Sequence, residues 1–274
     1  PLGADAFFLS PAKIELTIER GDTQLVSITI KNNDSQKHDF MPVVMGVTQG
    51  MNGAPVFVSG ASDVESWATT NITKISLLPG EKKEVQFVVN IPESVYPGSY
   101  YLGLGAEQLA EKDSNVNLSG RLLSLVNIKV AGTANEVLSI EKFLSERSVW
   151  VSRELSFLLK IKNVGNVEIP ISANLVLRDF FGKVIDKREI FLGNKLIPNT
   201  GREFILKEIL PIKYSFIPGI YQADIVINYG LTRQQIVATT KFWYFNLLIV
   251  GAVVLLFILL VVILNGKKLF FHRR

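Results

Sequence analysis

Short segments in which apolar and polar residues alternate run through the chain up to about residue 240, and this pattern most limits the available folds. Val26, Ile28 and Ile30, for example, fall on one face of a predicted strand. No amphipathic helix is predicted in this part. Because a single sheet would leave one apolar face in water, the pattern predicts β-sandwiches. Stripes of the same period occupy residues 85–91, 100–106, 155–161 and 223–227.

Three short motifs recur in the same order at an offset of about 120 to 130 residues, which suits tandem sandwich domains. The Tyr that ends the last motif opens a strand, and we expect its hydroxyl to bond nearby backbone as in a tyrosine corner. The pairs are Ile30-Lys31-Asn32 with Ile161-Lys162-Asn163, Leu78-Pro79 with Ile197-Pro198, and Pro97-Gly98-Ser99-Tyr100 with Pro218-Gly219-Ile220-Tyr221.

The repeat and the turn residues predict an all-β protein with two tandem Ig-like β-sandwich domains, followed by a single transmembrane α-helix. We expect a first sandwich with long loops over 7–133 and a second over 134–240, then a helix over 243–265 and a basic tail over 266–274. Residues 1–6 are expected to be a signal-peptide remnant, since Ala4-Asp5-Ala6 fits a cleavage site, or a cloning tag. Glu208 falls where the first copy has Val89, so its strand is predicted to end early or to bulge.

The predicted helix rests on the run Tyr244–Leu264, in which Asn246 is the one strongly polar residue. About 20 apolar residues suffice to cross a bilayer, whereas a buried hairpin would need more turn residues than Gly251. By the positive-inside rule, the N-terminal part lies outside the cell and the C-terminus in the cytoplasm. The expected anchor residues are the aromatics Trp243 and Tyr244 and the cations Lys267, Lys268, Arg273 and Arg274.

The charge balance excludes a nucleic-acid partner. The chain has 29 Lys and Arg against 25 Asp and Glu, and the four cations of the tail account for the net charge of +4. The part before the helix is therefore neutral and offers no general attraction for phosphate backbones. It also contains no Cys, so each domain must be stable without disulfides.

Loop length provides the functional hypothesis for the first domain. The segment between Asn32 and Pro79 is about a dozen residues longer than its counterpart in the second copy, and binding surfaces on sandwiches often lie on such loops. An aromatic ring with neighbouring amides suits a glycan, although Trp67 would equally serve to cap the core. The candidate ligand-binding residues are Gln49, Asn52, Trp67 and Asn71.

Catalysis finds little support in the sequence. His38 is the one histidine before the predicted helix, and no motif of a zinc protease, a serine hydrolase, a P-loop or a calcium loop is present. The chain is therefore predicted not to be an enzyme, with no catalytic residues, no cofactor and no metal site. A membrane-tethered hydrolase that uses paired carboxylates is the lesser alternative.

One family resemblance accompanies these patterns. The stretch Leu78-Pro79-Gly80-Glu81, together with Trp67, Ile91-Pro92 and Pro97-Gly98-Ser99-Tyr100-Tyr101, resembles the first domain of bacterial WxL-interacting surface proteins. The resemblance implies two Ig-like domains and a C-terminal membrane helix. It further implies peptidoglycan binding by the first domain and protein binding by the second.

These observations together predict a membrane-anchored bacterial surface protein that binds or scaffolds at the cell wall. The expected partners are the membrane and either peptidoglycan or other cell-surface proteins, and the expected location is the plasma membrane, crossed once. The alternative is a structural spacer or a subunit of a surface protein assembly.

Overall fold

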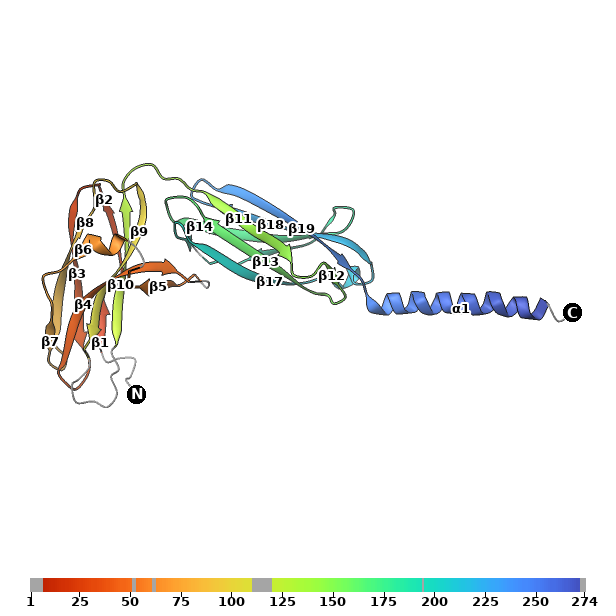
Figure 1. Ribbon diagram of the computed structural model, residues 1–274, viewed down its shortest axis with the longest axis horizontal. Coiled ribbons are helices and arrows are strands. Elements are labelled where there is room, and N and C mark those ends of the chain that lie inside the picture. Colours follow the sequence, from red (N-terminus) through yellow and green to blue (C-terminus); the bar gives the residue numbers. More distant parts are fainter. Residues whose placement is uncertain (1–6, 51–52, 61–62, 110–119, 194, 272–274) are drawn as a thin grey trace. The chain divides into compact units, whose positions relative to one another are not determined.

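The structure is a computed structural model that describes residues 7–50, 53–60, 63–109, 120–193 and 195–271. The chain separates into two compact units, the first built mainly from residues up to Val137 and the second mainly from residues after it. Each unit contains a β-sandwich, and one α-helix follows the second sandwich (Figure 1). The prediction of two tandem β-sandwiches is therefore confirmed.

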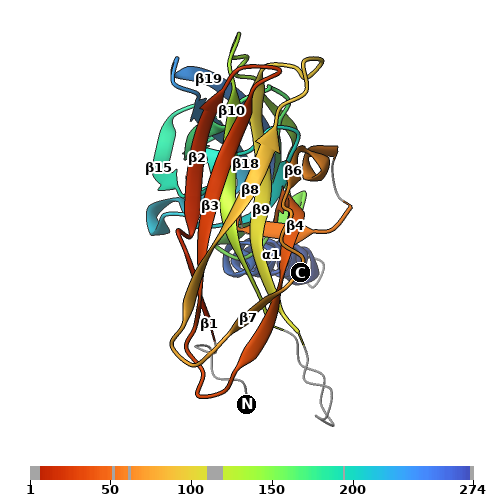
Figure 2. The ribbon, with the colours of Figure 1, turned by 90° about the vertical axis from the view of Figure 1, so that its left-hand side faces the viewer.

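The first sandwich consists of two facing sheets whose strands run along one common direction in Figure 2. The chain changes sheet between its first two strands, because β1 pairs antiparallel with β3 while β2 pairs parallel with β10. One sheet has the order β1 (Phe7–Ser10), β3 (Thr23–Asn32), β8 (Lys82–Asn90), β6 (Ala68–Thr69). The other has the order β2 (Lys13–Ile18), β10 (Arg121–Val130), β9 (Gly98–Gln108), β4 (His38–Gln49), β5 (Pro55–Val58), and β7 (Ile75–Leu77) also pairs with β4.

The second sandwich repeats this plan with a three-stranded and a six-stranded sheet. Its first sheet has the order β11 (Leu138–Ser145), β13 (Glu154–Asn163), β17 (Gly201–Ile209). The other has the order β12 (Val149–Trp150), β19 (Gln234–Tyr244), β18 (Gly219–Tyr229), β14 (Ile169–Arg178), β15 (Val184–Ile190), and β16 (Lys195–Leu196) also pairs with β14. Two 3-10 turns lie outside the sheets, η1 (Asp63–Trp67) in the first sandwich and η2 (Ile212–Tyr214) in the second.

The alternating stripes form the two cores, as their period of two predicts. In the first sandwich β3 and β8 are neighbouring strands of one sheet. Ile28 and Ile30 of β3 and Val85 and Phe87 of β8 lie on its inner face, and all four are buried. In the second, the stripe that contains Phe157 packs on Phe242 with ring centroids 5.6 Å apart. Burial of such side chains contributes about 1.5–3 kcal/mol each, which supports the sandwiches without cysteine.

The expected early end of the strand at Glu208 is wrong, whereas the alternative of a bulge there stays a prediction. β17 continues through Glu208 to Ile209, and the side chain of Glu208 is 2% exposed. Its carboxylate accepts a hydrogen bond from the amide of Ile209 and forms an ion pair with Arg188 at 3.2 Å. Both partners contact Oε1, whereas Oε2 is buried without a hydrogen-bond partner, so the buried charge is compensated on one oxygen alone.

The recurring Ile-Lys-Asn motif ends with a fully buried asparagine that ties together the same loops in both sandwiches. Asn32 and Asn163 are 0% exposed, and each Nδ2 donates to two backbone carbonyls. Each side-chain oxygen also accepts an amide proton from the residue two positions on. The acceptors are Gln36 and Leu77 at 2.7 and 3.0 Å for Asn32, and Val167 and Leu196 at 2.8 and 2.9 Å for Asn163.

The residue that follows the proline of the second motif, Pro79 or Pro198, adopts a left-handed conformation in both copies. Gly80 has φ of 76° and Asn199 has φ of 59°. Their amides donate to the carbonyls of Asn32 and Asn163 at 2.9 and 3.0 Å. Asparagine replaces glycine here because it is one of the few other residues that adopt this conformation at modest cost.

The expected tyrosine corners are also present. The hydroxyl of Tyr100 donates to the carbonyl of Tyr96 at 2.7 Å, and that of Tyr221 donates to Ile217 at 2.8 Å. The Pro-Gly-x-Tyr motif therefore fixes the entry of β9 and of β18 in the same way. The motif therefore has a structural role in both copies.

The prediction of a transmembrane segment over Tyr244–Leu264 is wrong. The helix α1 (Leu247–Phe271) begins three residues later than predicted, because Tyr244 still pairs with Gly219 in the sheet. Among the described residues, no helix combines the length and apolar character that crossing a membrane requires.

Without such a segment, the predicted plasma-membrane location and single-pass topology are wrong, and a membrane partner has no support. The six predicted anchor residues have different environments. Tyr244 is buried in the sandwich, and its hydroxyl donates to the carbonyl of Ser215 at 3.3 Å. Trp243 is exposed and its ring stacks on Phe245 with centroids 5.6 Å apart. Lys267 and Lys268 lie in α1, whereas Arg273 and Arg274, like residues 1–6, lie outside the described residues.

Asn246, the polar residue near the start of the apolar run, makes two hydrogen bonds with its side chain. Its side-chain oxygen accepts the amide proton of Leu248 at 2.9 Å, which caps the start of α1. Its amide nitrogen donates to Ser215 at 2.9 Å and so fixes the helix start to the loop before β18. The polar residue that interrupts the run is therefore a helix cap.

We expect Asn32→Ala to lower the free energy of unfolding by about 1–3 kcal/mol, because two buried carbonyls lose their donor. Asn163→Ala is expected to have the same effect on the second sandwich. Urea unfolding followed by fluorescence measures both changes. Asn33→Ala, at an exposed neighbouring position, is the control, and an equal loss there would contradict the role of Asn32.

Candidate functional site

Three of the four predicted ligand-binding residues lie in the described part of the chain, and their environments differ. Gln49 ends β4 and its amide donates to the carbonyl of Gly53 at 3.0 Å, while Asn52 lies outside the described residues. Trp67 is 6% exposed and packs on Tyr100 with ring centroids 4.8 Å apart, so its ring covers the core. Asn71 is exposed between β6 and β7. A ligand-binding role for these four residues stays a prediction.

His38 is engaged in structural hydrogen bonds. It opens β4 as a buried residue, with Nε2 at 2.7 Å from Asp34 Oδ2 and Nδ1 at 3.0 Å from Gln108 Nε2. The hydrogen bond from His38 and the amide of Ser35 hold the pKa of the Asp34 carboxyl below its usual value. Among the residues that the structure describes, no group of three or more His, Asp or Glu side chains lies close enough to hold a metal ion.

The outer face of the larger sheet of the second sandwich carries a network centred on Asp224 of β18. One carboxylate oxygen accepts hydrogen bonds from Thr239 at 2.7 Å and Gln222 at 2.8 Å. The other accepts from Arg178 at 2.7 Å. Asp224 is 6% exposed although it faces outward, because the neighbouring side chains of three strands cover it.

This network fixes the ionisation of Asp224. Burial by itself would raise the pKa of the carboxyl, but the hydrogen bonds from Arg178, Thr239 and Gln222 outweigh it and hold the pKa below the ordinary 3.8. The carboxylate therefore joins β14, β18 and β19 and keeps these three strands of the sheet rigid.

β19 is the last strand in the described part of the sequence, and most of one of its edges has no paired strand. Its neighbours are β18 on one side and β12 on the other, and β12 pairs with Trp243 and Tyr244 alone. Among the described residues, no strand pairs with the backbone of Gln234 to Phe242 on that side, although β11 lies alongside β19 and the amide of Ser145 donates to the hydroxyl of Thr240 at 3.3 Å. We call this stretch the β19 edge. Backbone groups along such an edge are free to pair with another chain.

The first sandwich covers the equivalent edge. β10 occupies the place of β19, since Val130 pairs with Gly98 as Tyr244 pairs with the repeat-equivalent Gly219. There β2 pairs in parallel with six residues of β10, from Leu125 to Val130. In the second sandwich the counterpart of β2 is β12, which pairs with two residues alone.

Burial of the inward side chains shows the same difference. Ser124 and Val126 of β10 are fully buried, whereas the equivalent Ala238 and Thr240 of β19 are partly exposed. The core beneath the β19 edge is therefore incomplete.

The sequence analysis missed this site because it is defined by the absence of a pairing partner. A signal was present, since the segment between β11 and β13 lacks a long alternating run like that of β2. Alternation indicates where strands form, but it does not show which strand covers which edge.

Comparison with known proteins gives no family for this chain. No family model matches it, and no curated protein matches it. A chaperone–tip adhesin complex of CFA/I fimbriae resembles it at 10% identity, covering 85% of this chain and 98% of that one, with a TM-score of 0.48. The class 5 fimbriae chaperone CfaA is similar at 11% identity, 85% and 98% coverage and a TM-score of 0.46.

A third structure is the CsuC–CsuE chaperone–tip adhesion subunit complex from Acinetobacter baumannii. It is 11% identical and covers 85% of this chain and 97% of that one, with a TM-score of 0.42. Similarity at this level is one of general architecture alone.

The assignment to WxL-interacting surface proteins is wrong. No family model supports the assignment. The motifs that suggested it are the turn at Gly80 and the tyrosine corner at Tyr100, which are structural features that sandwiches share. The predicted function as a membrane-anchored protein of the bacterial cell wall is corrected for the same reason and because no described helix can span a membrane.

We expect Asp224→Asn to lower the free energy of unfolding by about 1.5–3 kcal/mol at pH 7, because it weakens hydrogen bonds to a charged group. The native pKa of Asp224 lies below its unfolded value of about 3.9, so the carboxylate stabilises the fold fully above that pH. The stabilisation is lost as the pH falls through the native pKa. Urea unfolding at several pH values should therefore show the difference between variant and wild type shrinking below about pH 4.

Glu189→Gln is the matched control, since it removes the same charge from an exposed position on β15 of the same sheet. It is expected to change the stability little at any pH. An Asp224→Asn deficit that stays constant down to pH 2 would contradict the assigned role of the carboxylate.

Proposed function

We propose that this protein is a non-enzymatic binding protein that takes up an extended segment of another protein along the β19 edge. The observation that carries the proposal is that β12 covers two residues of β19 where β2 covers six of β10. Strand addition of this kind is a general mode of peptide recognition, in which main-chain hydrogen bonds supply the affinity.

The length and composition of the edge support this function. Gln234 to Phe242 is as long as an ordinary strand, and Lys241 is the one charged residue within it. Proteins usually protect exposed edges with charges, proline or bulges. A long and nearly uncharged edge is more consistent with a pairing surface than with a protected one.

The partly exposed inward positions indicate what the segment would contain. A strand added beside Ile236, Ala238 and Thr240 would place every second side chain over the incomplete core. We therefore infer a segment with apolar residues at alternate positions. Because Asp224 holds β18 and β19 together, the edge is preformed, which reduces the entropy lost on binding.

The experiment is selection of peptides of about ten residues by display on the full-length protein, followed by hydrogen exchange of the complex. Selected peptides are expected to alternate apolar and polar residues and to protect the amides of Gln234 to Phe242. Val237→Lys, at a position 51% exposed on the edge strand, is expected to weaken binding about tenfold or more, because added charge opposes strand pairing.

Val164→Lys is the matched control, since Val164 is 47% exposed and lies outside the strands. It is expected to leave the affinity unchanged. The proposal fails if no peptide is selected, if protection maps to another part of the chain, or if both lysine variants weaken binding equally. Pairing of two copies through the same edge would appear as concentration-dependent dimerisation without peptide and would also contradict a heterologous partner.

A further inference from the structure

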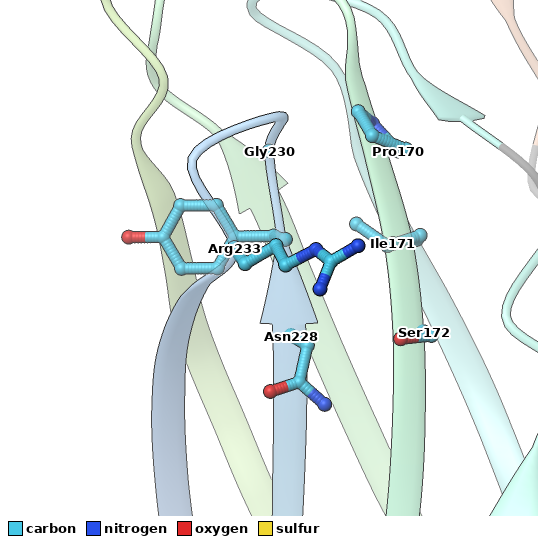
Figure 3. Close-up of a pocket in the computed structure, with 7 residues that line it drawn as sticks. Pro170, Ile171, Ser172, Asn228, Gly230 and Arg233 are labelled. Atoms are coloured by element: carbon cyan, nitrogen blue, oxygen red, sulfur yellow. The ribbon is translucent and has the colours of Figure 1, made fainter.

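A cavity of about 360 Å³ lies at one end of the second sandwich, next to the first residues of β19 (Figure 3). It is formed where β14 and β18 pair and where the turn after β18 begins. Pro170 and Ile171 supply apolar lining from β14, and Ser172 pairs with Asn228 across the two strands. A cavity of this size lies within the range of small-molecule sites.

Arg233 is the charged residue of this cavity. It belongs to the turn that joins β18 to β19, and in Figure 3 its guanidinium extends across the end of β18 toward Ile171. Among the described residues, its side chain makes no ion pair or hydrogen bond. No carboxylate belongs to the residues that line the cavity.

Two neutral donors accompany the guanidinium. The side-chain oxygen of Asn228 accepts a hydrogen bond from Gln235 at 3.1 Å, which leaves the two amide protons of Asn228 as donors. The hydroxyl of Ser172 lies beside it on the same face. The cavity therefore presents hydrogen-bond donors and one positive charge over an apolar lining.

The turn holds the arginine in this place. The amide of Gly230 donates to the carbonyl of Pro170 at 3.0 Å and ties the turn to β14. Arg233 has φ of 54°, a conformation that costs a residue other than glycine about 1–2 kcal/mol. Backbone strain of this kind is often found where a side chain must be held in a set position.

We propose that this cavity binds a small organic ligand through an anionic oxygen group, either a carboxylate or a phosphate. Arg233 is assigned the charge pairing, Asn228 and Ser172 donate further hydrogen bonds, and Pro170 with Ile171 contacts the apolar part of the ligand. A guanidinium suits this role because its planar donors match both kinds of oxyanion. The proposed ligand contacts are made by residues outside the β19 edge, although Asn228 also accepts a hydrogen bond from Gln235 at the start of that edge.

Calorimetric titration of the full-length protein with benzoate, phenyl phosphate and neutral benzamide tests the site. Both anions share the ring of benzamide, so the comparison isolates the anionic group. We expect at least one anion to bind ten times or more tighter than benzamide, and the tighter of the two identifies the preferred oxyanion. Arg233→Gln is expected to reduce that affinity about tenfold or more.

Arg20→Gln removes the same charge from an exposed position in the first sandwich and is expected to leave binding unchanged. Asn228→Leu provides a second variant within the cavity and is expected to weaken binding without removing charge. The proposal is overturned if no probe binds at millimolar concentration, if benzamide binds as tightly as the anions, or if Arg20→Gln weakens binding as much as Arg233→Gln.

Discussion

Backbone hydrogen bonding at the edges of the sheets is the constraint on which the rest of this structure depends. Every strand carries donors and acceptors on two sides, and a strand at the edge of a sheet can satisfy those on one side alone. In the first sandwich the chain solves this for β10 by changing sheets after β1, so that β2 covers it. In the second sandwich the corresponding β12 is two residues long, and most of β19 stays uncovered. The proposed strand addition rests on this difference between two copies of one plan.

Buried polar groups hold this plan in place. Asn32 and Asn163 each bind two carbonyls from inside the protein, and the hydroxyls of Tyr100 and Tyr221 each bind the turn before their strand. These contacts are equivalent in the two sandwiches, which identifies them as structural features. The proposed functions rest instead on the β19 edge and on the turn that carries Arg233.

The corrected expectations share one physical cause. Hydropathy in a sequence window reports composition, and it does not reveal that Trp243 and Tyr244 complete a strand or that Asn246 caps the helix that follows. The family resemblance likewise rested on Pro-Gly motifs, which create turns and tyrosine corners in many sandwiches and therefore indicate a fold rather than a function. Glu208 was misjudged because its partner Arg188 is distant in sequence.

The sequence by itself determined the elements of this protein and their repetition. The period of two set the buried stripes, and the recurrence of Asn32 as Asn163 and of Tyr100 as Tyr221 defined two related sandwiches, because strand alternation and turn chemistry are local properties. The tertiary structure decided the rest. It buried Trp67 against Tyr100, covered Asp224 with residues of three strands, left most of one edge of β19 without a paired strand and brought Arg233 to Asn228 and Ser172. Each of these depends on which distant segments pair, and pairing is settled by packing of the whole sandwich rather than by any one segment.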